Sequence, residues 1–215
     1  MINIIIIHYN ANDSLIKCLE SLKQITNPFT VHLFDNSDET PFIDVDRFNF
    51  IKYYDNTKGQ LVDFTNKIGK LEFASYTHSK SVQFILDLIK TECLLLDSDV
   101  ILKKDISTIM NNNYNVISGI ENREQLKTRF LPHIMYLNLN EQFKFFDESR
   151  ISPFDFRYDT CASLYEDIIK YGENKYKLID PDDYVIHEKG ASFNILAKRE
   201  WSEMLLRWKS KNKIK

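Results

Sequence analysis

The feature of this sequence that most constrains its fold is an apolar run at the beginning of the chain. Residues 2–7 read INIIII, so β-branched isoleucine fills almost every position. A strand with one solvated face alternates apolar and polar residues, whereas a strand covered on both faces, as in parallel sheets, is apolar throughout. We therefore expect residues 2–7 to be an inner strand of a mostly parallel sheet.

Strand and helix patterns alternate along the first half of the chain. Apolar residues at helical spacing predict a helix over residues 15–22, and residues 30–34 and 50–53 read as two short strands. A second helix, predicted over residues 79–90, leads into a strand over residues 93–96. This order indicates an α/β fold with helices flanking the sheet, in which ligands bind beyond the carboxyl ends of the strands.

The second half of the chain is less regular. Apolar spacing predicts a helix around Leu164 and Ile168. No element is predicted over residues 55–75. Four further strands are predicted, over residues 115–120, 135–139, 177–179 and 184–186.

Length and composition favour a single globular domain over residues 1–215. The hydrophobic fraction of 43% can supply a core, and no linker-like segment divides the chain. We divide the domain into two halves, residues 1–104 and residues 105–215, and expect a basic helix at the C-terminal end of the second half. The net charge of -3 argues against nucleic acid as a partner.

Several features favour a cytoplasmic protein. The three cysteines, Cys18, Cys93 and Cys161, are scattered through apolar patterns and are expected to be buried thiols. No apolar run is long enough for a signal peptide or a membrane span. The segment 198–215 is basic, with Trp201 among apolar residues at helical spacing, so peripheral contact with the inner face of the membrane is an alternative to core packing.

The clearest candidate site is a pair of aspartates in the run LLLDSDVIL. Asp97 and Asp99 follow the predicted strand 93–96, and residues two apart in an extended chain point to the same side if Ser98 keeps β geometry. Carboxylate oxygens suit Mn²⁺ or Mg²⁺, and such an ion can bind a diphosphate. Alternatively, one aspartate caps a turn and the other faces water. The position of the pair at the end of a buried strand favours a metal site.

Three segments of this sequence together resemble a known family. The order IIIIHYNANDSLIKCLESL, VHLFDNSDET and SVQFILDLIKTECLLLDSDVIL is similar to that of GT-A fold nucleotide-diphospho-sugar transferases, especially family 2 glycosyltransferases. The resemblance implies a nucleotide-sugar-binding half over residues 1–104 and an acceptor-side half over residues 105–215, and it covers residues 2–104 well and residues 150–193 more loosely. It implies a metal-dependent, inverting transfer of a sugar, from a UDP-sugar, to a glycan or lipid-linked acceptor in cell-surface polysaccharide biosynthesis.

The resemblance also implies roles for individual residues. Asp97 would face the nucleotide sugar, together with Ser98, and Asp99 would hold Mn²⁺ or Mg²⁺, with His187 completing the metal site. Structural roles at turns and strand ends are the alternatives for the residues expected to line the nucleotide pocket. These residues are His8, Tyr9, Asn10, Asp35, Asn36 and His78.

The catalytic base is harder to assign. The family's acidic pair falls near Asp159, where this chain has Asp-Thr, while Glu166 and Asp167 come one to two helical turns later. We predict Asp159 as the base, with Glu166, Asp167 and Asp155 as alternatives and a helix-capping role for Asp159 as another. Gly190 and Ser192 could approach phosphate. The segment 129–133 is assigned to the acceptor side.

Two other functions fit part of the pattern. A nucleotidyltransferase can use paired aspartates in a similar fold, but the segment HYNANDS lacks the glycine-rich, basic phosphate loop of such enzymes. A catalytically inactive sugar- or nucleotide-binding protein would keep the fold without turnover.

Overall fold

The structure analysed is a computed structural model of the chain. It describes residues 1–62, 70–110, 113–122, 127–139, 143–147, 150 and 160–188, and for residues 70–75 the backbone alone. The predicted C-terminal helix, Asp155, Asp159, Gly190 and Ser192 lie outside the described residues.

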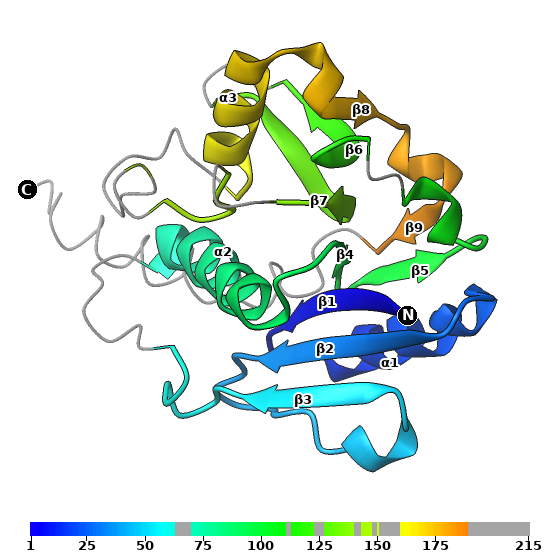
Figure 1. The fold of residues 1–215 in the computed structure, drawn as a ribbon. Coiled ribbons are helices and arrows are strands. Elements are labelled where there is room, and N and C mark those ends of the chain that lie inside the picture. Colours follow the sequence, from blue (N-terminus) through cyan, green and yellow to red (C-terminus); the bar gives the residue numbers. More distant parts are fainter. Residues whose placement is uncertain are drawn as a thin grey trace, which may run out of the picture.

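A mixed seven-stranded sheet forms the centre of the described structure (Figure 1). Its order is β3-β2-β1-β4-β7-β6-β8. The four strands β1 to β4 are mutually parallel, β7 runs antiparallel to both β4 and β6, and β8 is parallel to β6. The strands are β1 (Ile2–His8), β2 (Phe29–Asp35), β3 (Ile51–Asp55), β4 (Cys93–Asp97), β6 (Val116–Glu121), β7 (Arg129–Leu137) and β8 (Tyr176–Leu178).

Both faces of the inner strands are buried, which explains the apolar run of β1. Ile4 and Ile6 point into one core cluster and Ile5 into the other, and all three have no exposed surface. Burying each such side chain contributes roughly 1.5–3 kcal/mol. The predicted α/β fold, with a mostly parallel sheet between helices, is thus confirmed.

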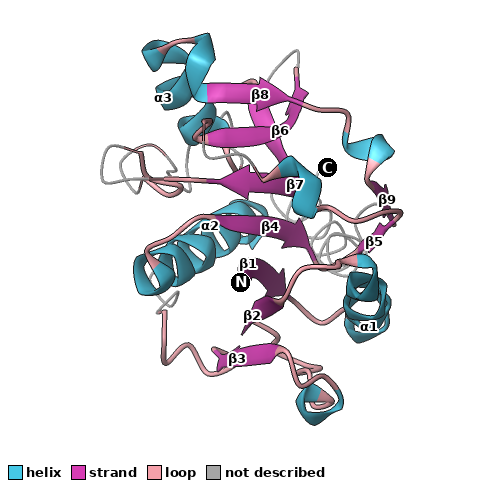
Figure 2. Ribbon diagram, turned by 45° about the vertical axis from the view of Figure 1, so that its right-hand side comes forward, coloured by secondary structure: helices cyan, strands magenta, loops and turns pink. Residues whose placement is uncertain are grey.

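Helices lie on both sides of this sheet (Figure 2). The helix α1 (Asn12–Ser21) packs Leu15 and Leu19 into the first cluster. On the opposite face, α2 (Lys70–Ile89) and α3 (Ala162–Tyr171) bury Val82 and Leu164 in the second cluster. The predicted order of strand, helix, strand, strand, helix and strand is therefore present in β1, α1, β2, β3, α2 and β4.

Three local predictions are corrected by the structure. Helix α2 begins at Lys70, nine residues before the start predicted at residue 79, and so extends into the segment 55–75. Strand β7 begins at Arg129, well before the predicted residue 135. Strand β4 ends at Asp97, and Ser98 and Asp99 form a turn before β5 (Val100–Leu102), so Ser98 does not keep β geometry.

A second, two-stranded sheet follows this turn. Strand β5 pairs antiparallel with β9 (Val185–His187). The paired residues Leu102 and Val185 are 83 positions apart in the sequence (185 − 102). The register aligns Val100 with His187. This long-range pairing brings the end of the described chain to the end of β4.

Candidate metal and nucleotide site

The candidate site lies where the parallel strands β1, β2 and β4 end. The register pairs His8 with Asp35 across β1 and β2, and Ile7 with Asp97 across β1 and β4. Predicted site residues from three separate segments therefore share one edge of the sheet, as expected for the ligand-binding edge of an α/β fold.

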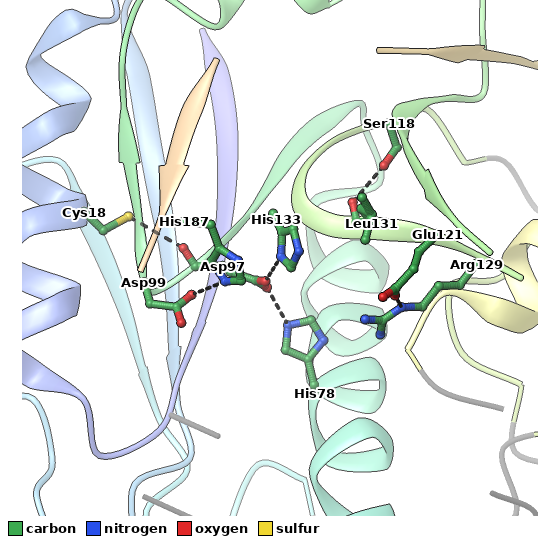
Figure 3. A network of polar contacts seen from close by, with 10 residues as sticks. All are labelled: Cys18, His78, Asp97, Asp99, Ser118, Glu121, Arg129, Leu131, His133 and His187. Atoms are coloured by element: carbon green, nitrogen blue, oxygen red, sulfur yellow. Dashed lines mark hydrogen bonds and ion pairs between the residues drawn. The ribbon is translucent and has the colours of Figure 1, made fainter. Parts of the chain in front are cut away.

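Asp97 lies among histidine side chains from three different elements (Figure 3). Its Oδ2 is 2.7 Å from Nδ1 of His133 on β7, and its Oδ1 is 3.7 Å from Nε2 of His78 on α2. Burial favours the neutral acid, but the hydrogen bond from His133 and the charges of His133, His78 and His187 outweigh burial and lower the pKa of Asp97. The site thus favours an ionised carboxylate.

Asp99 is more deeply buried and is held by β9. Its Oδ1 is 3.1 Å from Nε2 of His187, and its backbone carbonyl accepts a hydrogen bond from the N–H of Glu188. The predicted metal residues Asp99 and His187 therefore do lie together. Ser98, between the two aspartates, is buried in the turn.

Glu188 fixes the end of β9 against α1. Its carboxylate accepts hydrogen bonds from Ser14 Oγ at 3.0 Å and from Lys17 Nζ at 2.7 Å. The hydrogen bond from Lys17 outweighs the effect of burial and helps to lower the pKa of Glu188. Because Glu188 follows His187 directly, these contacts help to set the position of the His187 ring.

The rings of His133 and His187 lie directly against each other. Their ring centroids are 3.8 Å apart, with an angle of 31° between the ring planes. Asp97, His133 and His187 each place one potential ligand atom within 4.8 Å of the other two. Two imidazole nitrogens and one carboxylate oxygen form a donor set that fits a divalent transition metal.

His133 is the member of this cluster that sequence reasoning missed. The sequence places the segment 129–133 on the acceptor side and predicts no role for His133 at the metal. Its place next to Asp97 follows from the antiparallel pairing of β7 with β4, which aligns Leu96 with Ile134. No local sequence pattern indicates which strand will lie beside β4.

Two of the predicted nucleotide-pocket residues are buried in structural contacts. Asp35 has no exposed surface. Its Oδ1 accepts a hydrogen bond from the N–H of Ser37. Its Oδ2 accepts hydrogen bonds from the N–H of Phe42 and from the hydroxyl of Tyr53. His8 is also fully buried, with Nε2 at 2.8 Å from Asn12 Oδ1. Burial lowers the pKa of His8, which keeps this imidazole neutral.

Asn10 connects two loops at the same edge. Its backbone lies in the left-handed region, with a φ of 53°, and its Oδ1 accepts from the backbone N–H groups of Glu39 and Thr40. Its Nδ2 donates to Asp38, which also accepts a hydrogen bond from the Tyr9 hydroxyl. Asn10 thus fixes the loop that follows β2.

The remaining predicted pocket residues retain part of their surface. Tyr9, Asn36 and His78 are all half-buried. Asn36 donates to Ser81 Oγ on α2 and accepts from Asn56 Nδ2, so it connects the end of β2 to α2.

The alternative bases Glu166 and Asp167 make ion pairs on α3. Lys127 Nζ lies 2.9 Å from Glu166, and Arg150 Nη1 donates to Asp167 at 2.9 Å. These contacts give both carboxylates a structural role.

A cavity of about 700 Å³ opens beside the stacked histidines. His133 and His187 form part of its wall, to which Gly119 of β6 and the adjacent Pro181 also contribute. The lining combines apolar side chains, such as Leu131 and Ile186, with charged ones. The charged lining residues are Lys103, Glu121, Asp180 and Asp182.

No helix in the described part of the chain is both long and apolar enough to cross a membrane. Cys18, Cys93 and Cys161 all lie in that part as buried thiols. Burial is the main factor that raises the pKa of Cys18 and of Cys93, so neither side chain is a reactive thiolate.

Comparison with known proteins finds matches in structure alone. No protein-family model and no curated protein sequence matches the chain. The glycosyltransferase GlyE of Streptococcus pneumoniae TIGR4 matches 84% of this chain and 45% of its own, with a TM-score of 0.51 and 12% identity. Mouse xyloside xylosyltransferase 1, in its apo form, matches 83% of this chain and 85% of its own, with a TM-score of 0.50 and 12% identity.

A third solved structure, the WbbM bifunctional glycosyltransferase, matches 83% of this chain with a TM-score of 0.47 and 11% identity. The present chain spans 38% of WbbM and 45% of GlyE, less than half the length of either. At these identities the likeness concerns the fold. The described chain has a fold that is also found in glycosyltransferases of solved structure.

Proposed function

We propose that this protein is a metal-dependent glycosyltransferase that moves a sugar from a nucleotide-diphosphate donor to a glycan or lipid-linked acceptor. The observation that carries this proposal is the cluster of Asp97, Asp99, His133 and His187 at the carboxyl end of β4, in a fold shared with known glycosyltransferases. UDP is the nucleotide that we expect, as the resemblance to the GT-A family implies.

The donor nucleotide would bind across the ends of β1, β2 and β4. Tyr9 and Asn36 keep exposed surface there, so they are the side chains that we assign to direct contact. Both ring nitrogens of His78 are buried, so His78 would act at the nucleotide site through its contact with Asp97. His8, Asn10 and Asp35 would instead hold the loops in place through the internal hydrogen bonds described above. Asp97 and Ser98 would lie next to the donor sugar.

The diphosphate would bind at the carboxylate–histidine cluster. A divalent ion, Mn²⁺ or Mg²⁺, would there stabilise the negative charge that develops on the leaving diphosphate. The protein contributes ionised Asp97 and a His187 ring that is held in place by Asp99 and by the contacts of Glu188 with α1.

We place the acceptor in the cavity beside His133 and His187. Carboxylates such as Glu121 and Asp180 can accept hydrogen bonds from sugar hydroxyl groups, while Leu131 and Ile186 offer apolar surface to the faces of a sugar ring. An inverting reaction requires a base on the acceptor side, and we assign this role to Asp159. Glu166 and Asp167 are already engaged with Lys127 and Arg150.

The biological setting that we propose is the biosynthesis of cell-surface polysaccharide, with the protein acting in the cytoplasm or at the inner face of the membrane. This setting follows from the family resemblance and from the basic segment 198–215.

Release of nucleoside diphosphate from a panel of UDP- and GDP-sugars, with Mn²⁺ present, tests the proposed function. We expect at least one donor to be cleaved, with the rate reduced about 100-fold or more in Asp97→Asn and Asp159→Asn. Asp167→Asn is the matched control, since it alters a carboxylate bound to Arg150 and should keep most of the activity.

One result would overturn the proposed function, and another would change the assignment of the base. Binding without cleavage of every donor, with a panel of saccharide acceptors present, would identify an inactive binding protein. Loss of activity in Asp167→Asn but not in Asp159→Asn would move the base to α3.

A further inference from the structure

Three separate elements bring nitrogen and oxygen donors to one point at the end of β4. Asp97 is the last residue of β4, His133 comes from β7 and His187 is the last residue of β9. The pairing of β7 with β4 and of β9 with β5 fixes their relative positions. The cluster is therefore built by tertiary structure and not by the flexibility of one loop.

Each histidine of the stacked pair contacts a different aspartate. Nδ1 of His133 is 2.7 Å from Asp97, and Nε2 of His187 is 3.1 Å from Asp99. The two rings lie 3.8 Å apart, and all three side chains of the Asp97, His133 and His187 cluster keep part of their surface exposed. The cluster is thus accessible at the edge of the sheet, and the cavity reaches two of its members.

We propose that His133 is a metal ligand, together with Asp97 and His187. In this proposal Asp99 is not a ligand but orients the His187 ring through their hydrogen bond. Histidine ligands commonly hold their position through a hydrogen bond to a carboxylate, which is the relation of His187 to Asp99. The role of the ion in catalysis rests on the proposed function, whereas its binding by these residues does not.

The spacing of the donors fits such a centre. Metal–ligand bonds of about 2.0–2.2 Å allow two ligand atoms to be up to about 4.4 Å apart. The three atoms of the cluster lie within 4.8 Å of one another, and Nδ1 of His133 is 2.7 Å from Oδ2 of Asp97. A movement of about 0.4 Å would therefore bring even the widest spacing allowed here within the limit for two ligands of one ion. A bound ion would replace the hydrogen bond between Asp97 and His133.

The donor set predicts which ions bind. Imidazole nitrogen prefers transition metals such as Co²⁺, Zn²⁺ and Mn²⁺, whereas Mg²⁺ prefers oxygen ligands and keeps several waters. With two imidazoles and one carboxylate, this centre should bind Co²⁺ and Zn²⁺ much more tightly than Mg²⁺. An oxygen-only site at Asp97 and Asp99 would show no such strong preference.

The test is metal binding to the full chain without nucleotide, by isothermal titration with Co²⁺ and Mg²⁺ and by the visible absorption of bound Co²⁺. We expect Co²⁺ to bind at least about tenfold more tightly than Mg²⁺. His133→Ala should weaken Co²⁺ binding about tenfold or more, change the Co²⁺ spectrum and leave weak Mg²⁺ binding nearly unchanged.

The controls separate loss of a ligand from loss of structure. His133→Gln keeps a polar group that can hydrogen-bond Asp97, so it should fold while losing Co²⁺ affinity as His133→Ala does. His32→Asn removes a buried imidazole elsewhere in the sheet and should bind Co²⁺ like the native protein. Circular dichroism establishes that each variant is folded.

Co²⁺ binding that is unchanged in both His133 variants, or no stronger than Mg²⁺ binding in the native chain, would overturn the inference. Donor cleavage is not measured in this experiment. A native protein that binds Co²⁺ through His133 but cleaves no nucleotide sugar would contradict the proposed function and leave this inference standing. A protein that cleaves a nucleotide sugar, but whose His133 variants bind Co²⁺ as tightly as the native chain, would contradict this inference and leave the proposed function standing.

Discussion

Asp97 and Asp99 are separated by one residue, yet the structure gives them different surroundings. Asp97 ends a strand and faces His133 and His78, whereas Asp99 sits in a turn and contacts His187. The pKa of Asp97 is lowered because the histidine contacts outweigh burial. These surroundings suit Asp97 to binding a metal ion directly and Asp99 to holding the His187 ring in position.

Burial lowers the pKa of the His32 imidazole, whereas burial acts to raise the pKa of a carboxyl group such as Asp97. In its neutral form, Nε2–H can donate to Asn3 Oδ1 and Nδ1 can accept from the Tyr54 hydroxyl, each at 3.0 Å. Burial, and then the charge of Lys52, lower the pKa of His32 from 6.5 to about 4. Between these two values the unfolded chain binds more protons than the folded one, so acid favours unfolding.

We therefore predict that the free energy of unfolding falls as the pH decreases from about 7.5 to about 4.5, with His32 contributing on the order of 2 kcal/mol to the loss. Urea unfolding of the native chain and of His32→Asn at both pH values measures this contribution. The variant should lose less stability than the native chain, since their other titrating groups are the same. Equal losses would show that His32 is not held neutral by the fold.

At the scale of secondary structure, the sequence predicts where the strands and helices of the first half lie along the chain. It predicts less well which strands are adjacent in the sheet. Residues 2–7, 15–22 and 93–96 each carry a pattern that one element explains, and the structure contains those elements. The antiparallel place of β7 beside β4 depends on contacts between distant segments, so His133 could not be assigned to the site. Asp97, Asp99 and His187 could be assigned to the candidate site from the sequence, because each follows a strand that the apolar pattern predicts.

Strand β6 meets the short 3-10 helix Pro181–Asp183 through a glycine. A Cβ added to Gly119 would lie 2.7 Å from Cγ of Pro181 and 3.0 Å from Cδ1 of Leu131. All three residues line the cavity that we assign to the acceptor. The close approach of β6 to Pro181 therefore depends on the absence of a side chain at residue 119.

Gly119→Ala should destabilise the protein by about 1–3 kcal/mol, because the new methyl group overpacks this contact. Urea unfolding of Gly119→Ala, Pro181→Ala and the double variant measures the effect and its cause. If the clash with Pro181 is responsible, the double variant should be more stable than the sum of the two single changes predicts. A Gly119→Ala protein as stable as the native chain would contradict the packing described for β6.

At the scale of the whole molecule, the fold assembles a site from segments far apart in the sequence. The ends of β1, β2 and β4 form one edge of the sheet, and β9 adds His187 through its pairing with β5 (Figures 1 and 3). The likeness in fold to GlyE and to xyloside xylosyltransferase 1 agrees with the fold expected from residues 2–104 at the level of glycosyltransferases in general. Our central claim is that this edge binds a nucleoside diphosphate through a divalent metal.

Isothermal titration of UDP, with and without Mn²⁺, tests this claim most directly, with GDP as the alternative nucleotide. We predict that Mn²⁺ strengthens nucleotide binding at least about tenfold, because the ion bridges the diphosphate and the carboxylate–histidine cluster. Asp97→Ala should abolish this enhancement, and Asp99→Ala should reduce it. Binding of either nucleotide that is equally strong without Mn²⁺, and unchanged in both variants, would contradict the claim.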